Sequence, residues 1–508
     1  MQPLTLKYSR IKQSHVLFFT SGVCFLLLLV LTGIPGYFWS PPQGIHFSRH
    51  IDSFSYSYYY FSEHSGFFHP GNFNLESING RCASEFPIMY YITSLLYLFF
   101  GVNFWTLKII TILMLFLGFL YCVKMVFLLC ENLILSVLLT TLFFTSTVIL
   151  YYGTFYLPDI HALGFLMVSL YYFFLYFKFQ EKRHLLKLYI FITLSALLKA
   201  SFFYYGCIFL VMILLISKRE KIRHGQNILF FFLSLIIIAS WYVYANRYNF
   251  ANNAWYYTLS PKPFWKESRE RITLALGFIS NYWYSKYYFQ STFHFFFLTF
   301  LLGIFYVRKI SLYLVLFFSL ISLSLLYASL FLTQFIHHDY YFIAIVPAII
   351  IIVTLSLISI VKNIPNKLIL SCVYISLLVI TILSANYAKL NLHRRYSNNF
   401  DSFSAPRYLL YGANDYLDSI GVSKESKFLV IGDRSQNGSL AFLRRFGWIY
   451  PNFQRDTINR NTNLKVADYL VVLRPSVNTI PKNIQEKLKN CDKYVYYNNY
   501  IYSLKNYK

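Results

Sequence analysis

Acidic residues are scarce in this chain. It holds 20 Asp and Glu among 508 residues, and only 13% of its residues are charged, whereas 57% are hydrophobic. Too little polar surface remains to coat a soluble domain of this size, so a soluble protein is excluded. The sequence also lacks a GxGxxG, P-loop, HExxH or GxSxG motif, and its seven cysteines are scattered without the spacing of a metal site. Nucleotide binding therefore finds no support.

Long apolar runs are what the chain has instead. A transmembrane helix needs roughly 20 apolar residues, and about eleven runs come close to that length, so we predict a polytopic, mainly α-helical membrane protein. The first run is too long for a signal peptide and is expected to be an uncleaved span. The expected spans are 16–38, 105–129, 132–152, 158–178, 185–200, 202–217, 227–246, 290–307, 310–333, 341–361 and 367–387.

Basic residues mark one side of the membrane. Lys and Arg gather before the first span and after the fourth, sixth, eighth and tenth spans. Because such loops face the cytoplasm, we expect a cytoplasmic N-terminus and, from the overall composition, the inner membrane of a bacterium. Topology and anionic lipid also account for much of the net charge of +25, so nucleic acid is not an expected partner.

Two long segments, 39–104 and 247–289, fall on the outer side in this topology. The apolar stretch 87–100 is short for a span and is expected to lie along the interface; if it crossed the membrane, every later loop would change sides. Polar residues replace the apolar runs after about residue 390, so we assign 1–390 to the membrane domain and 391–508 to a small extracytoplasmic α/β domain. Its expected elements are helices over 406–420 and 437–446, strands over 427–431 and 469–473, and a hairpin over 494–504.

The acidic residues near the outer ends of the apolar runs are Asp52, Glu85, Asp159 and Asp339. An ionisable group near the hydrocarbon is costly and usually marks a pathway or an active site. Each acid also has a structural explanation, as a helix cap or as a charge that compensates a helix N-terminus. Asp339 has His338 and Tyr340 as neighbours, and a hydrogen-bonding cluster at the interface is the simpler interpretation of this group.

Lys199 is the most unusual cation, because it lies in an otherwise apolar region near the outer end of the fifth expected span. It either snorkels to the interface or provides the charge for an anion held at membrane depth. The 247–289 segment carries a basic stretch, formed by Lys262, Lys266, Arg269 and Arg271. These charges either meet the lipid surface or clamp a phosphate or pyrophosphate.

The sequence around these residues resembles the GT-C superfamily of membrane glycosyltransferases. It is most similar to family 39 and its bacterial relatives, the protein O-mannosyltransferases and the lipid A aminoarabinose transferases. Asp52 is followed by a Tyr-rich helix, and Glu85-Phe-Pro-Ile-Met-Tyr-Tyr, running to Gly101, is similar to the pattern Glu-x-Pro-Pro-Leu-Tyr-Tyr of that family. Leu197-Leu-Lys199 and His338-Asp-Tyr-Tyr341 match further features, so the resemblance covers residues 15–360.

The sequence also departs from the family. Ser53 stands where the mannosyltransferases have the second acid of an Asp-Glu pair. Ile88 replaces the second proline of the Pro-Pro pair, and Phe86 replaces the basic residue often found after the glutamate. These differences count against mannosyl transfer to protein and leave the sugar open.

The resemblance implies transfer of a sugar from a polyprenyl-phosphate donor to an acceptor at the outer face, with inversion. Asp52 would be the general base, and Glu85 would orient the acceptor, the donor or a divalent ion, which is the one cofactor suggested. Lys199 and the basic stretch would stabilise the leaving lipid phosphate, and a groove between spans would hold the prenyl chain. The acceptor is a lipid, a glycan or a protein.

Other functions stay open at this point. A lipid-linked glycan ligase or polymerase also works at the outer face, but its long basic loop usually comes late in the chain. A lipid or glycan transporter would place ionisable residues near the middle of the membrane and show repeat symmetry. A non-catalytic sensor would use residues 391–508 as a binding module. The acidic 39–104 segment favours the transferase.

Overall fold

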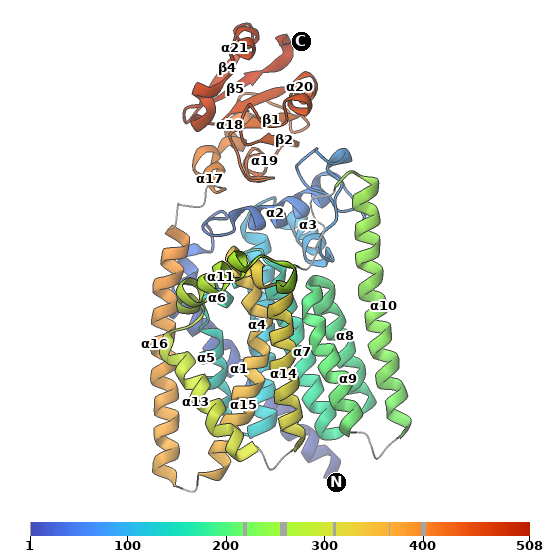
Figure 1. Cartoon of the computed structure of the whole chain (residues 1–508), viewed down its shortest axis with the longest axis vertical. Helices are drawn as coiled ribbons and strands as arrows, with labels where there is room; N and C mark the ends of the chain where they lie inside the picture. Colours follow the sequence, from blue (N-terminus) through green and yellow to red (C-terminus); the bar gives the residue numbers. More distant parts are fainter. Residues whose placement is uncertain are drawn as a thin grey trace.

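The computed structural model describes residues 2–216, 221–254, 262–307, 311–364, 366–397 and 403–507. Most of these residues are helical and form a bundle in which long helices run side by side (Figure 1). In this part of the chain, seven helices are long and apolar enough to cross a membrane, or up to nine if each of two bent helix pairs is one span. The predicted fold class, a mainly α-helical multi-pass membrane protein, is confirmed.

The candidate spans include most of the long helices. These helices are α1 (Gln2–Leu31), α4 (Trp105–Cys130), α7 (Pro158–Phe179), α10 (Lys221–Ala251), α14 (Ser311–Leu330), α15 (Val346–Asn363) and α16 (Lys367–Ser397). The first bent pair, with an angle of 79°, joins α5 (Leu133–Phe144) and α6 (Thr147–Gly153). The second, with an angle of 97°, runs from α11 (Arg269–Phe278) through α12 (Tyr284–Tyr287) to α13 (Gln290–Val307).

The criterion counts fewer helices than the eleven spans expected, and the difference lies at two short helices. The expected spans 185–200 and 202–217 correspond to α8 (Lys182–Leu198), with 17 residues, and α9 (Tyr204–Ile216), with 13. Within the described residues both helices are shorter than 18 residues, so neither is counted among the seven to nine candidate spans. The extended backbone of Lys199, with φ −150° and ψ 99°, ends α8 and separates the two helices.

Two short helices lie at the end of the bundle that carries the C-terminal domain. They are α2 (Phe47–Ser62) and α3 (Ile88–Phe100), and the N-terminus lies at the opposite end (Figure 1). α3 has 13 residues, which is short for a span, and exposes apolar side chains such as Leu98 and Phe99; its position along the interface stays a prediction. Gly101, with φ 68°, ends α3.

The C-terminal domain contains a five-stranded sheet in the order β2-β1-β3-β5-β4. The strands are β1 (Phe428–Ile431), β2 (Gly447–Tyr450), β3 (Tyr469–Val472), β4 (Lys493–Tyr496) and β5 (Asn499–Ser503). β1 pairs in parallel with β2 and β3, whereas β5 pairs antiparallel with β3 and β4. The helices are α17 (Ala405–Leu410), α18 (Ala413–Ser419), α19 (Gly438–Leu443), α20 (Thr457–Val466) and α21 (Lys482–Leu488).

Most elements expected in this domain are present. The strands 427–431 and 469–473 are β1 and β3, and the hairpin is formed by β4 and β5. Its turn residues, Tyr497 and Asn498, both have positive φ, as a two-residue hairpin turn of this kind requires. The expected helix 406–420 is split at Gly412, whose φ is 79°. β2 was not predicted, because its four residues are all buried and show no alternation.

Candidate active site

α2 carries two charged residues of the candidate site. The helix begins at Phe47, after His46, which has a positive φ of 63° and makes no side-chain cap. Asp52 therefore lies in the second turn of α2, so the capping role considered from the sequence does not apply. Arg49 lies three residues before Asp52, a spacing at which side chains on a helix are neighbours.

Asp52 is a buried carboxylate with 5% of its surface exposed. Its Oδ1 accepts a hydrogen bond of 2.8 Å from Nδ2 of Asn437, which lies between β1 and α19. No side chain in the described ranges forms an ion pair with Asp52. Burial raises the pKa of Asp52 to about 6, although the Asn437 hydrogen bond and the charge of Arg49 oppose the rise. Such a carboxylate is ionised above pH 6 and is a stronger base than an ordinary Asp.

Glu85 is paired with Arg49. Nη2 of Arg49 lies 2.9 Å from each carboxylate oxygen of Glu85, and the hydroxyl groups of Ser84 and Tyr90 donate to the same carboxylate. Burial opposes the charge of Glu85, but Arg49 and the two hydroxyl groups outweigh it and lower the pKa of Glu85 to about 2. Glu85 is therefore a fixed anion at neutral pH.

Lys199 forms an ion pair with Asp159, in which Nζ lies 3.0 Å from Oδ1. The Lys199 side chain is only 15% exposed, so it does not snorkel out to water. Its ammonium group also lies over the aromatic rings of Tyr340 and Tyr341, 5.2 and 4.9 Å from their centroids, in a cation–π arrangement. Asp159 lies in the first turn of α7, where it also compensates the helix N-terminus.

Asp339 is fully buried and is paired with Arg395 near the end of α16. Nη2 of Arg395 lies 2.5 Å from Oδ2, and the hydroxyl group of Tyr152 donates to Oδ1 at 2.6 Å. Nε2 of His46 lies 3.7 Å from that same oxygen. Two rings lie with their centroids 5.2 Å from the His46 ring, those of His338 and Tyr340.

The structure brings these pairs together into one cluster. Arg49 interacts electrostatically with Asp52, Glu85 and Tyr340. Tyr340 in turn lies beneath Lys199 and next to His46. The cluster contains seven of the residues singled out from the sequence: Asp52, Glu85, Asp159, Lys199, His338, Asp339 and Tyr340.

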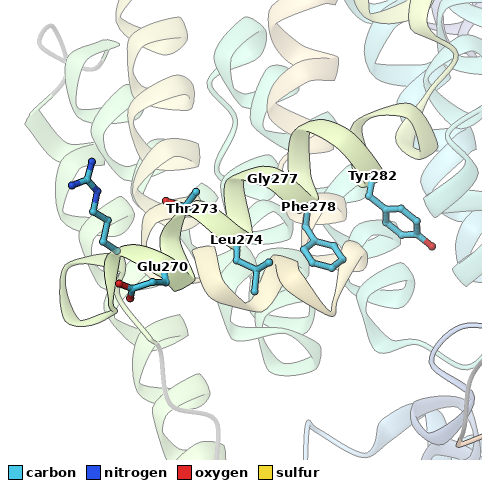
Figure 2. A pocket seen from close by; sticks show the side chains of 7 residues that line it. Glu270, Thr273, Leu274, Gly277, Phe278 and Tyr282 are labelled. Atoms are coloured by element: carbon cyan, nitrogen blue, oxygen red, sulfur yellow. The ribbon is translucent and has the colours of Figure 1, made fainter.

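The basic stretch has no recorded side-chain contact with this cluster among the described residues, although α11 packs against residues 332–336, which precede His338. Its four exposed residues are Lys262, Lys266, Arg269 and Arg271. No hydrogen bond or ion pair between described residues joins any of them to the cluster, and residues 255–261 lie outside the described part. Arg269 lines a pocket of about 760 Å³ along α11. Figure 2 shows Leu274, Phe278 and Tyr282 along this pocket, so much of its lining is apolar or aromatic.

A metal site is not apparent in the described ranges, where no group of three or more His, Cys, Asp and Glu side chains could hold an ion. Glu85 was the metal ligand considered from the sequence. Its two carboxylate oxygens instead accept hydrogen bonds from Arg49, Ser84 and Tyr90.

Sequence reasoning missed several residues of the cluster, namely His46, Arg49, Arg395 and Asn437. Arg49 had a signal, because a buried carboxylate is expected to have a cation nearby and Arg49 lies one turn from Asp52. Arg395 and Asn437 had none. Asn437 is 385 residues from Asp52 in the chain, and no local pattern relates the two.

No protein-family model and no curated protein sequence matches this chain. Solved structures do. ArnT from Cupriavidus metallidurans in the apo state is similar with a TM-score of 0.60 and 10% identity, over 94% of this chain and 97% of that one. Archaeal oligosaccharyltransferase AglB from Archaeoglobus fulgidus, in complex with an inhibitory peptide and a dolichol-phosphate, gives a TM-score of 0.51 and 11% identity, over 89% and 69%. Arabinofuranosyltransferase AftD from Mycobacteria gives 0.51 and 12%, over 95% and 39%. The chain has the GT-C fold of these membrane glycosyltransferases.

Proposed function

We propose that this protein is an inverting glycosyltransferase that moves a sugar from a polyprenyl-phosphate donor to an acceptor hydroxyl or phosphate, with Asp52 as general base. The observation that carries the proposal is that Asp52 is buried in a cluster of charges but forms no ion pair with any described residue. The other acids of the cluster each have a cation: Glu85 has Arg49, Asp159 has Lys199 and Asp339 has Arg395. A carboxylate without such a partner is available to accept a proton.

The class of donor is supported by the fold. ArnT from Cupriavidus metallidurans is also similar to this chain when bound to undecaprenyl phosphate, with a TM-score of 0.57 and 10% identity over 96% of this chain and 97% of that one. AglB holds a dolichol-phosphate. We infer a polyprenyl phosphate carrier here as well, and a membrane position suits a substrate with a long apolar tail.

The chemistry assigned to the cluster is a single displacement at the anomeric carbon. Asp52 takes the proton of the acceptor hydroxyl as the acceptor oxygen forms its bond to that carbon. The bond between the carbon and the phosphate oxygen breaks on the opposite side, so the configuration inverts and the lipid phosphate leaves with both electrons. Lys199 stabilises the charge of that phosphate. Glu85, fixed by Arg49, orients the hydroxyl groups of the sugar or the acceptor.

Asp52→Asn tests the base. Release of undecaprenyl phosphate would be measured by mass spectrometry, from a panel of undecaprenyl-phosphate monosaccharides, with the membrane lipids and glycans of the source cell as acceptors. Loss of a general base is expected to slow transfer by about a hundredfold or more. Glu63→Gln, which neutralises the exposed acid at the end of α2, is the matched control and should leave the rate unchanged. An Asp52→Asn enzyme as fast as wild type would contradict the proposal.

We place the cluster at the extracytoplasmic face of the inner membrane, with the N-terminus in the cytoplasm. Lys362 and Lys367 mark the end of α15 and the start of α16, at the end of the bundle away from the C-terminal domain (Figure 1). Single cysteines at positions 63 and 362 test this in a background in which all seven native cysteines are replaced by serine or alanine. An impermeant maleimide should label intact cells at 63 and should label 362 only after lysis; the reverse pattern would invert the topology.

A further inference from the structure

The C-terminal domain and α2 share one hydrophobic core. Phe47, Ile51, Phe54 and Tyr58 follow each other at spacings of three and four residues, so they form one stripe along α2. The stripe is buried together with apolar residues of the C-terminal domain, among them Leu410, Leu440, Phe442 and Ile449. The helix that carries Asp52 is therefore packed against the C-terminal domain as well as against the bundle.

Backbone hydrogen bonds join the 39–104 segment to the edge of the sheet. The amide of Leu75 donates to the carbonyl of Gly447 at 2.7 Å, and the amide of Gly447 donates to the carbonyl of Phe73 at 3.1 Å. Asn74 forms an isolated parallel bridge with Gly447 between them. This segment thus covers the outer edge of β2, which would otherwise present unpaired backbone groups.

The loop between β1 and α19, residues 432–437, is held in one conformation by its own side chains. Asp433 accepts hydrogen bonds from the amides of Ser435 and Ser439, at 2.7 and 2.9 Å. Ser435 Oγ accepts from the amide of Gly438 at 2.9 Å. From outside the loop, Asn74 Nδ2 donates to the carbonyl of Gln436 at 3.1 Å. A loop fixed at both ends of its path gives its last residue a defined position.

Gly438, directly after this loop, lies against α2. A Cβ atom at this position would be 2.2 Å from Ser435 Oγ and 3.1 Å from Cε1 of Phe47, so there is no room for a side chain. The close approach of Gly438 to Phe47 brings the preceding residue, Asn437, to the carboxylate of Asp52. Asn437 is fully buried.

We propose that Asn437 is a positioning residue, through which the C-terminal domain holds the carboxylate of Asp52 for proton transfer, so that this domain is part of the catalytic site. The inference rests on the proposed function. The titratable groups that face Asp52 are Arg49 on its own helix and Glu85 and Cys82 from the segment before α3. Asn437 contributes the hydrogen bond that favours the ionised form.

Asn437→Leu, which keeps the shape and removes the donor, is the test. Because the hydrogen bond favours the ionised form of Asp52, its loss should move the acid limb of kcat/KM upward by about one pH unit. At pH 6 the ionised fraction would fall roughly fivefold, whereas at pH 8.5 it would hardly change. Asn437→Asp places a second carboxylate beside the first and should move the limb further in the same direction. Arg434→Ala, an exposed residue of the same loop, is the control and should keep the wild-type profile.

The readouts separate this inference from the proposed function. If Asp52→Asn is inactive but both Asn437 variants keep the wild-type pH profile, Asn437 is not a positioning residue while the base assignment stands. If Asp52→Asn is fully active, the base assignment fails first. Gly438→Ala provides a variant that leaves Asn437 intact: it should displace the loop from Phe47 and shift the acid limb in the same direction, and an unshifted limb in a folded Gly438→Ala protein would also overturn the inference.

Discussion

Asp52→Asn is expected to stabilise the protein while it slows transfer by about a hundredfold or more. Burial raises the pKa of Asp52 from 3.8 to about 6, so the folded protein disfavours its ionised form by about two pKa units relative to a solvated Asp. This difference corresponds to about 3 kcal/mol of folding free energy at neutral pH. Asn has the same shape and can still accept the hydrogen bond from Asn437, but it carries no charge to bury.

The gain in stability of Asp52→Asn over wild type must depend on pH, and its sign follows from the raised pKa of Asp52. A carboxyl group whose pKa is raised by folding contributes stability that is fully present below pH 3.8 and is lost as the pH rises through about 6. Wild type and Asp52→Asn should therefore melt at similar temperatures at pH 4. The difference should grow up to about pH 6 and then stay constant, and at pH 8 we expect it to reach a few degrees.

The assay is thermal unfolding of the detergent-solubilised protein, followed by tryptophan fluorescence at several pH values. Glu63→Gln, on the same helix but exposed, should show no such dependence. Two results would refute the reasoning: an Asp52→Asn protein that melts below wild type at pH 8, or a difference in melting temperature that does not vary with pH. Either would mean that the negative charge of Asp52 is compensated in the folded protein.

Three further perturbations test the rest of the cluster. Arg49→Gln leaves Glu85 buried without its cation and should lower the free energy of unfolding by about 3–5 kcal/mol. Thermal unfolding should show that the double variant with Glu85→Gln recovers part of this loss. An Arg49→Gln protein as stable as wild type would contradict the pairing. Lys199→Gln should lower the rate of undecaprenyl phosphate release about a hundredfold, and Lys199→Arg should retain more activity; equal rates for the two variants would exclude a role for the positive charge. Neutralising all four residues of the basic stretch should change the rate of undecaprenyl phosphate release less than about threefold, because exposed charges contribute little. A larger loss of rate would indicate that the basic stretch binds the donor phosphate.

The membrane fold could be predicted because apolar length is a local property of the sequence. The positions of α4, α7 and α15 follow from runs of hydrophobic residues alone. At α8 and α9, two expected spans that are not counted among the candidate spans, the apolar runs do exist, but the break at Lys199 leaves each helix short. The length of such a helix depends on the residues at its ends, and tertiary contacts set the backbone angles of those residues.

The cluster could be predicted only in part. Asp52, Glu85 and Lys199 were found because a charge among apolar residues is conspicuous in a sequence. Their partners were not found from the sequence. Arg395 lies in a run of basic residues that is typical of a helix end, and Asn437 is one of many polar residues in the C-terminal domain. Contacts between residues hundreds of positions apart depend on how the bundle and the sheet meet, which no local pattern records.

The shared core of α2 and the C-terminal domain sets an order on biosynthesis. α2 leaves the ribosome long before its partner residues, because Asn437 follows Asp52 by 385 positions. At roughly 5–20 residues per second, the interval is about 20–80 seconds, during which the apolar stripe of α2 lacks its partners in the C-terminal domain. A chain that lacks the C-terminal domain would expose the part of this stripe that the domain buries, and an exposed apolar surface of this kind is a target for chaperones and proteases.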